Sequence, residues 1–114
     1  MSAISTHVLD IAAGRPAAGM RVRLERVDSA GEQVRPAAEE IAAASTDADG
    51  RVASLGPEAI APGTYRLIFD TGGYSAGTGA FFPEVTVTFA VTDDGHYHVP
   101  LLMSPFGYST YRGS

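Results

Sequence analysis

Alternation of hydrophobic and polar residues marks three segments of the chain. In Met20 to Val27, the Met, Val and Leu side chains point one way while two Arg and a Glu point the other. The segments 63–70 and 84–92 repeat this pattern. One apolar side and one polar side are typical of a strand in an antiparallel sheet with one buried face. All three segments are therefore predicted to be strands.

Three further segments favour strands on other grounds. The segment 4–11 is short, rich in β-branched residues, and ends before Gly14-Arg15-Pro16, which is typical of a turn. The segment 96–104 is strongly apolar, and 108–111 is long enough for a last short strand. The run Asp47-Ala48-Asp49-Gly50 predicts a turn. The sequence therefore predicts an all-β protein.

Two segments do not fit the strand pattern. Pro36 to Ala44 is rich in Ala and Glu, and its intrinsic propensity favours a helix that begins at the proline. Thr71 to Ala80 is a Gly-rich connection that has room for one short helical turn. No internal repeat or linker is present, so residues 1–114 are expected to form a single domain.

Composition narrows the possible chemistry. The chain has 114 residues, of which 45% are hydrophobic and 18% charged, which is typical of a globular protein. It contains no Cys, and all eight basic residues are Arg, so thiol and lysine nucleophiles are excluded. The net charge of -5 argues against nucleic acid as a partner. No apolar run approaches the ~20 residues that cross a membrane, and no signal peptide precedes the first strand, so a cytoplasmic location is expected.

Three histidines and one arginine are the candidates for chemistry. Taken alone, His7 is a strand residue of structural or merely exposed character, and Arg51 is a solvated turn residue. His96 and His98 share one face of their strand because side chains alternate. They could form a metal pair, but a zinc site normally needs three protein ligands, so no metal site is predicted.

Four motifs occur in a characteristic order. They are Thr6-His7-Val8-Leu9-Asp10, Thr46-Asp47-Ala48-Asp49-Gly50-Arg51, His96-Tyr97-His98-Val99-Pro100-Leu101-Leu102 and the final Tyr111-Arg112-Gly113-Ser114. In these motifs, nearly over its full length, the chain resembles the 5-hydroxyisourate hydrolases, which are transthyretin-related enzymes of urate breakdown. The final Tyr-Arg-Gly-Ser is the most specific piece because it distinguishes these enzymes from the hormone-carrying transthyretins.

The resemblance implies a transthyretin-like sandwich of two sheets, with about eight strands and one short helix. It implies that residues 36–46 form a strand, against their helical propensity, and that the short helix lies within 71–80. It also implies a homotetramer, a dimer of dimers, whose active sites lie at the subunit interface.

The resemblance also assigns roles to particular residues. His7, Arg51, His98 and Ser114 match the catalytic residues, and His7, Arg51 and Tyr111 match positions that contact the substrate. His96 is expected to be peripheral, the role of Arg112 stays open, and no cofactor or metal is implied.

The reaction expected from the resemblance is hydrolysis of 5-hydroxyisourate to 2-oxo-4-hydroxy-4-carboxy-5-ureidoimidazoline. A neutral imidazole of His7 or His98 would activate water, Arg51 would stabilise the oxyanion, and the Ser114 carboxylate would orient a histidine. The sequence does not decide which imidazole is the base. The alternative is a non-enzymatic carrier of small aromatic ligands. An immunoglobulin-like interaction domain is a weaker reading because the chain lacks the Cys and Trp of that core.

Overall fold

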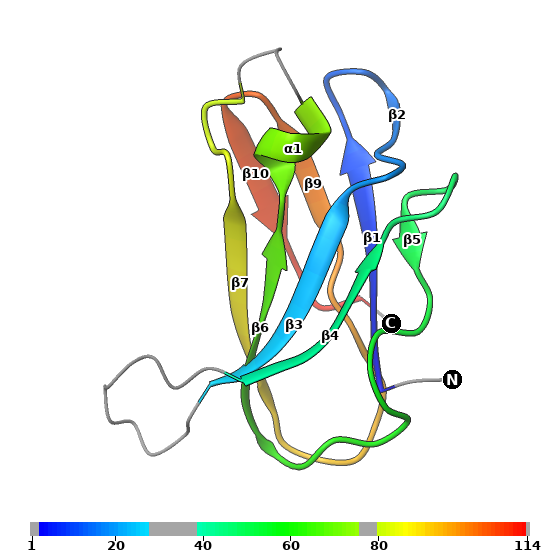
Figure 1. Ribbon diagram of the computed structural model, residues 1–114, viewed down its shortest axis with the longest axis vertical. Helices are drawn as coiled ribbons and strands as arrows, with labels where there is room; N and C mark the ends of the chain where they lie inside the picture. Colours follow the sequence, from blue (N-terminus) through cyan, green and yellow to red (C-terminus); the bar gives the residue numbers. More distant parts are fainter. Residues whose placement is uncertain (1–2, 28–38, 76–79, 114) are drawn as a thin grey trace.

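Two β-sheets pack face to face around one hydrophobic core in a computed structural model that describes residues 3–27, 39–75 and 80–113 (Figure 1). The strands are β1 (Ile4–Asp10), β2 (Arg15–Pro16), β3 (Arg21–Val27), β4 (Glu39–Ser45), β5 (Arg51–Val52), β6 (Gly63–Phe69), β7 (Val85–Val91), β8 (Tyr97–His98), β9 (Leu101–Ser104) and β10 (Gly107–Thr110). The first sheet has the order β10-β9-β1-β2, with β5 and β8 also paired to β1. The second sheet has the order β4-β3-β6-β7. The predicted two-sheet sandwich is confirmed.

Most of the predicted strands form where the sequence pattern placed them. The predicted segments 4–11, 20–27, 63–70 and 84–92 correspond to β1, β3, β6 and β7 within one or two residues. The segment 96–104 is divided into β8 and β9, because Pro100 between them has no backbone N–H to donate to a ladder. The strand count within the described residues exceeds the expected eight because β2, β5 and β8 are segments of only two residues each.

Alternating burial along the strands builds the core. Ile4, Thr6 and Val8 of β1 are at most 1% exposed, and the residues between them point to the outer face of the first sheet. The second sheet supplies Val22, Leu24, Tyr65, Leu67 and Phe69, each at most 1% exposed. The Thr6 hydroxyl is buried without penalty because it donates to the carbonyl of Val99 at 2.6 Å.

The alanine-rich segment 39–45 is a strand, so its helical propensity is overridden by tertiary pairing. β4 pairs antiparallel with β3 from Arg21↔Ser45 to Arg26↔Glu39, with one irregularity after Leu24. Ile41, Ala42 and Ala44 pack against the core. Propensity differences are only a fraction of a kcal/mol per residue, roughly up to 0.7, whereas this pairing provides a ladder of hydrogen bonds and a buried face. Residues 36–38 of the predicted segment lie outside the described residues.

The short helix expected within 71–80 is α1 (Thr71–Ser75), between β6 and β7. Asp70 precedes it, and its carboxylate accepts a hydrogen bond from the backbone N–H of Gly73 at 2.9 Å, which caps the helix. Residues 76–79 of the expected segment lie outside the described residues. In the described part of the chain, no helix has the length and apolar character needed to cross a membrane.

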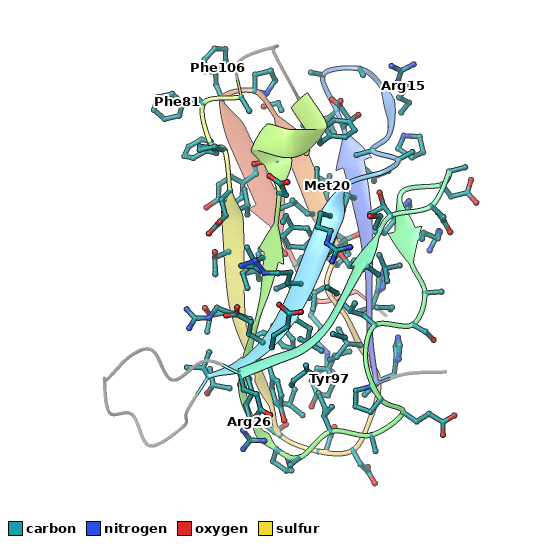
Figure 2. All side chains as sticks on the ribbon, viewed as in Figure 1. Arg15, Met20, Arg26, Phe81, Tyr97 and Phe106 are labelled. Carbon is teal, nitrogen blue, oxygen red and sulfur yellow. The ribbon has the colours of Figure 1, made fainter. Side chains whose placement is uncertain are left out.

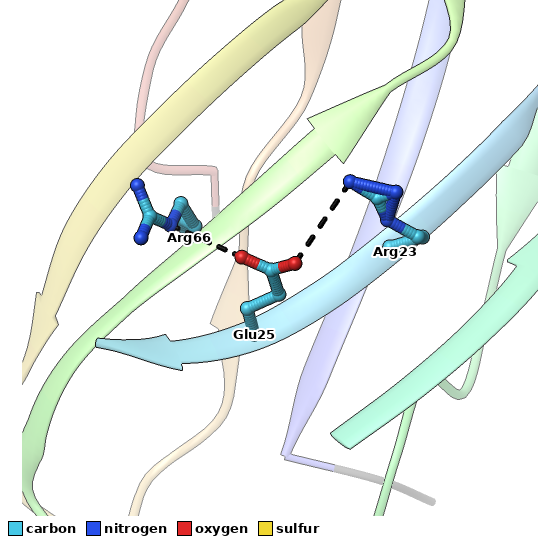
Figure 3. A network of polar contacts seen from close by, with 3 residues as sticks. All are labelled: Arg23, Glu25 and Arg66. Atoms are coloured by element: carbon cyan, nitrogen blue, oxygen red, sulfur yellow. Dashed lines mark ion pairs between the residues drawn. The ribbon is translucent and has the colours of Figure 1, made fainter. Parts of the chain in front are cut away.

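The outer face of the second sheet carries a small ion-pair network (Figure 3). Glu25 on β3 lies 3.2 Å from Arg66 on β6, which is its register partner, and 3.8 Å from Arg23 on its own strand. Ion pairs at such surfaces contribute about 0–1 kcal/mol. Arg23 and Arg66 thus each have an ion-pair partner on this sheet, whereas Arg51 lies on the other sheet.

Four aromatic side chains gather at the α1 end of the sandwich, and we call them the aromatic cluster: Phe81, Phe82, Phe106 and Tyr108. Phe82 makes edge-to-face contacts with Phe81 and Tyr108, with ring centroids 4.9 and 5.3 Å apart. Phe81 and Phe106 project outward side by side (Figure 2) and are 66% and 78% exposed. An exposed group of this size is typical of a surface that contacts another molecule.

Candidate active site

The outer face of the first sheet brings three of the predicted site residues together. His7 and Arg51 are direct register partners between β1 and β5, and Ser5 and His98 are partners between β1 and β8. Ser5 and His7 are two residues apart on one strand and therefore share a face. Because Ile4, Thr6 and Val8 point into the core, this shared face is the outer one. His7, Arg51 and His98 thus form one polar group on the surface of β1 and its neighbours.

A tight turn before β5 aims Arg51. One carboxylate oxygen of Asp47 accepts hydrogen bonds from the backbone N–H groups of Asp49 at 2.8 Å and Arg51 at 2.9 Å. Gly50 adopts a φ of 76°, and a Cβ at this position would overlap the carbonyl oxygen of Val8. Only glycine fits such a close approach at positive φ. The predicted Asp-Gly turn is confirmed, and its function is to fix the start of β5.

The hydrogen bonds to Asp47 also change its acidity. The backbone N–H of Arg51, and next that of Asp49, lower the pKa of the Asp47 carboxyl below its ordinary value of 3.8. The carboxylate is therefore ionised, and able to accept both bonds, throughout the neutral and mildly acidic range.

Removing the Asp47 carboxylate should lower activity indirectly, because the turn that positions Arg51 loses two hydrogen bonds. Asp47→Ala is expected to lower kcat/KM by about 10-fold, because small displacements of a positioned group are costly in catalysis. Asp47→Asn keeps an oxygen that can accept both bonds and should stay close to the native rate. Steady-state kinetics of both variants check this, and equal losses in the two would contradict a role in aiming Arg51.

The protonation of His7 follows from its partner. Its Nε2 lies 2.9 Å from the carbonyl oxygen of Asp49. A carbonyl oxygen only accepts, so Nε2 carries a hydrogen and donates it. The neutral His7 ring therefore has its free lone pair on Nδ1.

His98 is the half-buried imidazole of the group. Its Nδ1 lies 2.7 Å from the hydroxyl oxygen of Ser5, which also lies 2.9 Å from Nε2 of His96. Burial first, and then the nearby charges of Arg51, His7 and His96, lower the pKa of His98 below its ordinary value of 6.5. The sign follows from the charge of the protonated form: desolvation and neighbouring cations both disfavour imidazolium. His98 is thus neutral at neutral pH and can accept a proton.

The segment that follows β10 pairs with the strand of His98 at one residue. The backbone N–H of Gly113 donates to the carbonyl of His98 at 2.8 Å, and the two residues form an isolated bridge. A Cβ on Gly113 would lie 2.6 Å from Cδ2 of His98, so glycine permits this approach. Ser114, a predicted site residue, lies outside the described residues.

Tyr111 is not placed with the histidines. It lines a pocket of about 160 Å³ with Tyr97, Val99, Arg112 and residues of β7, and this pocket includes none of His7, Arg51 and His98. Tyr97 and Val99 alternate with His98, so the pocket lies on the opposite side of that strand. The guanidinium of Arg112 stacks on the Tyr97 ring at 4.4 Å, a cation–π contact. Contact of Tyr111 with substrate remains a prediction.

Sequence reasoning did not single out Ser5, and it took His96 to be peripheral. Ser5 is 7% exposed and connects His96 to His98. One signal was present: Ser5 stands two residues before His7 and so faces the same side of the strand. Its partner, however, lies 93 residues away, and only the pairing of β1 with β8 reveals it. Asp10, at the end of the same strand, accepts hydrogen bonds from the backbone N–H of Ala13 and the hydroxyl of Tyr74.

Two imidazoles beside a guanidinium can activate water and stabilise an oxyanion. A neutral imidazole with a lowered pKa is suited to general-base catalysis, and a guanidinium offers paired donors to a carbonyl. Among the described residues, Arg51 forms no salt bridge that would occupy its donors. Within the same residues, no group of three or more His, Cys, Asp or Glu side chains could hold a metal ion.

Known proteins are similar to this chain over nearly its whole length. The model of the HIUase/Transthyretin family matches residues 4–113. The 5-hydroxyisourate hydrolase of Caulobacter vibrioides is 48% identical over 121 residues, covering 100% of each chain. The structure of the Klebsiella pneumoniae 5-hydroxyisourate hydrolase superimposes with a TM-score of 0.83 at 38% identity, covering 100% of each chain. Sea bream transthyretin in complex with thyroxine has a TM-score of 0.80 at 29% identity, covering 97% of this chain and 94% of its own.

Proposed function

Because the chain belongs to the HIUase/Transthyretin family, we propose that it hydrolyses 5-hydroxyisourate to 2-oxo-4-hydroxy-4-carboxy-5-ureidoimidazoline, a step of urate breakdown. The observation that carries this proposal is the grouping of His7, Arg51 and His98 on one sheet face. It occurs in a chain that is similar over its full length to 5-hydroxyisourate hydrolases.

The first step is attack of water on the ring carbonyl of the cyclic amide. His98 is the proposed general base, because its pKa is lowered and its Nε2 is the nitrogen that does not face Ser5. Nε2 takes a proton from the water while the water oxygen bonds to the carbonyl carbon. The electron pair of the C=O bond moves to oxygen, and the resulting oxyanion lies against the Arg51 guanidinium.

The second step opens the ring. The oxyanion re-forms its C=O bond, the C–N bond of the cyclic amide breaks, and the leaving nitrogen takes the proton from the imidazolium of His98. The base is thereby regenerated, and the product carries a new carboxyl group.

The other predicted residues hold the substrate. His7, whose Nε2–H donates to the Asp49 carbonyl, has its lone pair on Nδ1 and would use it to orient the substrate or water. Arg51 binds a carbonyl of the ring through paired hydrogen bonds. Ser114 and Tyr111 are proposed to complete the site, Ser114 through its carboxylate and Tyr111 by contact with the substrate.

We also propose that the working form is a homotetramer, a dimer of dimers with sites at the subunit interface. The group of His7, Arg51 and His98 lies on an open sheet face, and a second copy laid over that face would enclose it. The exposed Ile11, at 56%, and the aromatic cluster offer apolar surface for such contacts. Analytical ultracentrifugation tests the assembly, and a fully active monomer would contradict it.

A second function, carriage of a small aromatic ligand, is favoured by one finding, the similarity to a transthyretin in complex with thyroxine. The same open face would then bind a ligand and leave it unchanged. A lowered pKa at His98 has no use in such a carrier, which places this function second.

The absorbance of freshly generated 5-hydroxyisourate tests the proposal. The protein should accelerate the ultraviolet decay far beyond the spontaneous rate, at a rate proportional to enzyme concentration. A decay no faster than the spontaneous one would remove the hydrolase and leave the carrier, which calorimetry with aromatic ligands would then examine.

A further inference from the structure

The Ser5 hydroxyl lies between the imidazoles of His98 and His96. Neither Ser5 nor His96 has a part in the reaction proposed above. Ser5 Oγ is 2.7 Å from Nδ1 of His98 and 2.9 Å from Nε2 of His96. Both distances are those of good hydrogen bonds, and Ser5 is 7% exposed on the central strand of its sheet.

Hydrogen counting couples the two rings. A hydroxyl has one hydrogen to donate and can accept from another group. With both rings neutral, two arrangements satisfy the two contacts and also use the hydroxyl hydrogen; a third, in which both rings donate to the two lone pairs of Ser5, leaves that hydrogen unused between the rings. In the two that use it, either His98 donates from Nδ1 and Ser5 donates to His96, or His96 donates from Nε2 and Ser5 donates to His98. The first leaves Nε2 of His98 with a free lone pair, and the second leaves it protonated.

The charges around His98 favour the first arrangement. His98 is surrounded by Arg51, His7 and His96, all of which disfavour further positive charge on its ring. Nδ1 faces Ser5, so Nε2 is the nitrogen left for the shared face with Arg51 and His7. A lone pair beside a guanidinium is attractive, whereas an N–H dipole pointing at it is repulsive.

We propose that Ser5 and His96 are positioning residues that hold His98 in the Nδ1–H tautomer and keep Nε2 free as the base. The hydrogen bonds run from His98 to Ser5 and from Ser5 to His96. The arrangement does for His98 what a carboxylate does in a catalytic triad, but with a hydroxyl and a second imidazole. The catalytic consequence rests on the proposed function, whereas the tautomer itself does not.

The tautomer is measured on the native protein without substrate. Long-range ¹H–¹⁵N NMR of histidine-labelled protein, above the pKa of His98, distinguishes a protonated ring nitrogen from a bare one. Nδ1 of His98 should have the shift of a protonated nitrogen and Nε2 that of a bare nitrogen. The opposite assignment in the native protein would overturn the proposal, whether or not any variant folds.

Variants test the hydroxyl. Ser5→Ala should move both His98 nitrogens toward averaged shifts and lower kcat by roughly 10- to 100-fold with little change in KM. Ser5→Thr keeps the hydroxyl and should restore both the shifts and the rate. Ser109→Ala, at an exposed serine on β10, is the matched control and should change neither. Native shifts in Ser5→Ala would overturn the proposal.

His96 is tested with a conservative and a disruptive change. His96→Gln offers an amide oxygen that accepts the bond from Ser5, so it should keep the tautomer, while His96→Leu should move it toward Ser5→Ala. Equal behaviour of the two would overturn the role of His96. If the native protein has the expected tautomer but no hydrolase activity, the proposed function fails and the tautomer assignment stands.

Discussion

His98→Ala is expected to lower kcat/KM by about 10²–10⁴-fold, which is the usual contribution of a well-placed general base. The half-buried ring is neutral at neutral pH because burial and neighbouring charges lower its pKa. The alanine side chain has no basic nitrogen, so the attacking water has no proton acceptor at position 98. Initial rates with fresh 5-hydroxyisourate measure the loss.

Two controls separate loss of the base from loss of structure. His98→Asn places an amide N–H where Nδ1 stood and can still donate to Ser5, but it has no basic nitrogen. It should be as inactive as His98→Ala while keeping the native fold by circular dichroism. Added imidazole should restore part of the rate to His98→Ala, whose cavity can admit it. An Asn variant within a few-fold of the native rate would rule out His98 as the base.

Arg51→Met is expected to lower kcat/KM by about 10²–10³-fold, as does removal of one oxyanion-stabilising donor in other hydrolases. Methionine keeps much of the aliphatic stem, so the lost function is that of the guanidinium. Arg21→Met, at an exposed arginine of the other sheet, is the control and should stay near the native rate.

Arg51→Met should also change the pH dependence of activity, and the direction of the change follows from the positive charge that the variant lacks. Arg51 is one of the groups that lower the pKa of His98, so its removal should raise that pKa toward 6.5. NMR titration of the His98 ring protons measures this. The residual activity of Arg51→Met should accordingly begin to fall at a higher pH than that of the native enzyme as the solution is acidified. An unchanged His98 pKa would show that Arg51 lies too far away to act on it.

Much of the fold could be predicted from local pattern. The strands β3, β6 and β7 were predicted from the alternation of hydrophobic and polar residues, and β1 from its β-branched residues and the turn that follows it. The segment 39–45 could not be predicted locally, because its Ala and Glu favour a helix and only the edge of β3 makes it a strand. Its correct assignment came from the family resemblance.

Three residues of the candidate site were named from the sequence, but the contacts between them were not. The family motifs identified His7, Arg51 and His98, and the register of β1 with β5 and β8 brings them together. The link through Ser5 could not be predicted because it depends on strand pairing between residues far apart in sequence. Tyr111 lies in a different pocket of the same chain, and Ser114 stays a prediction.

The parallel pairing of β1 with β8 and β9 has a consequence for how the protein folds during its synthesis. β1 leaves the ribosome before every strand that it pairs with. It has two residues of pairing with β2 and two with β5, whereas its longest partner, β9, is made only after β7. Contacts of such separation form slowly, because a long loop must close before they are rewarded. During synthesis the edges of β1 therefore stay largely unpaired, and His7 and His98 come together only after β8 has been made. The second sheet, whose strands are complete by Val91, can assemble first and serve as the surface on which the first sheet is completed.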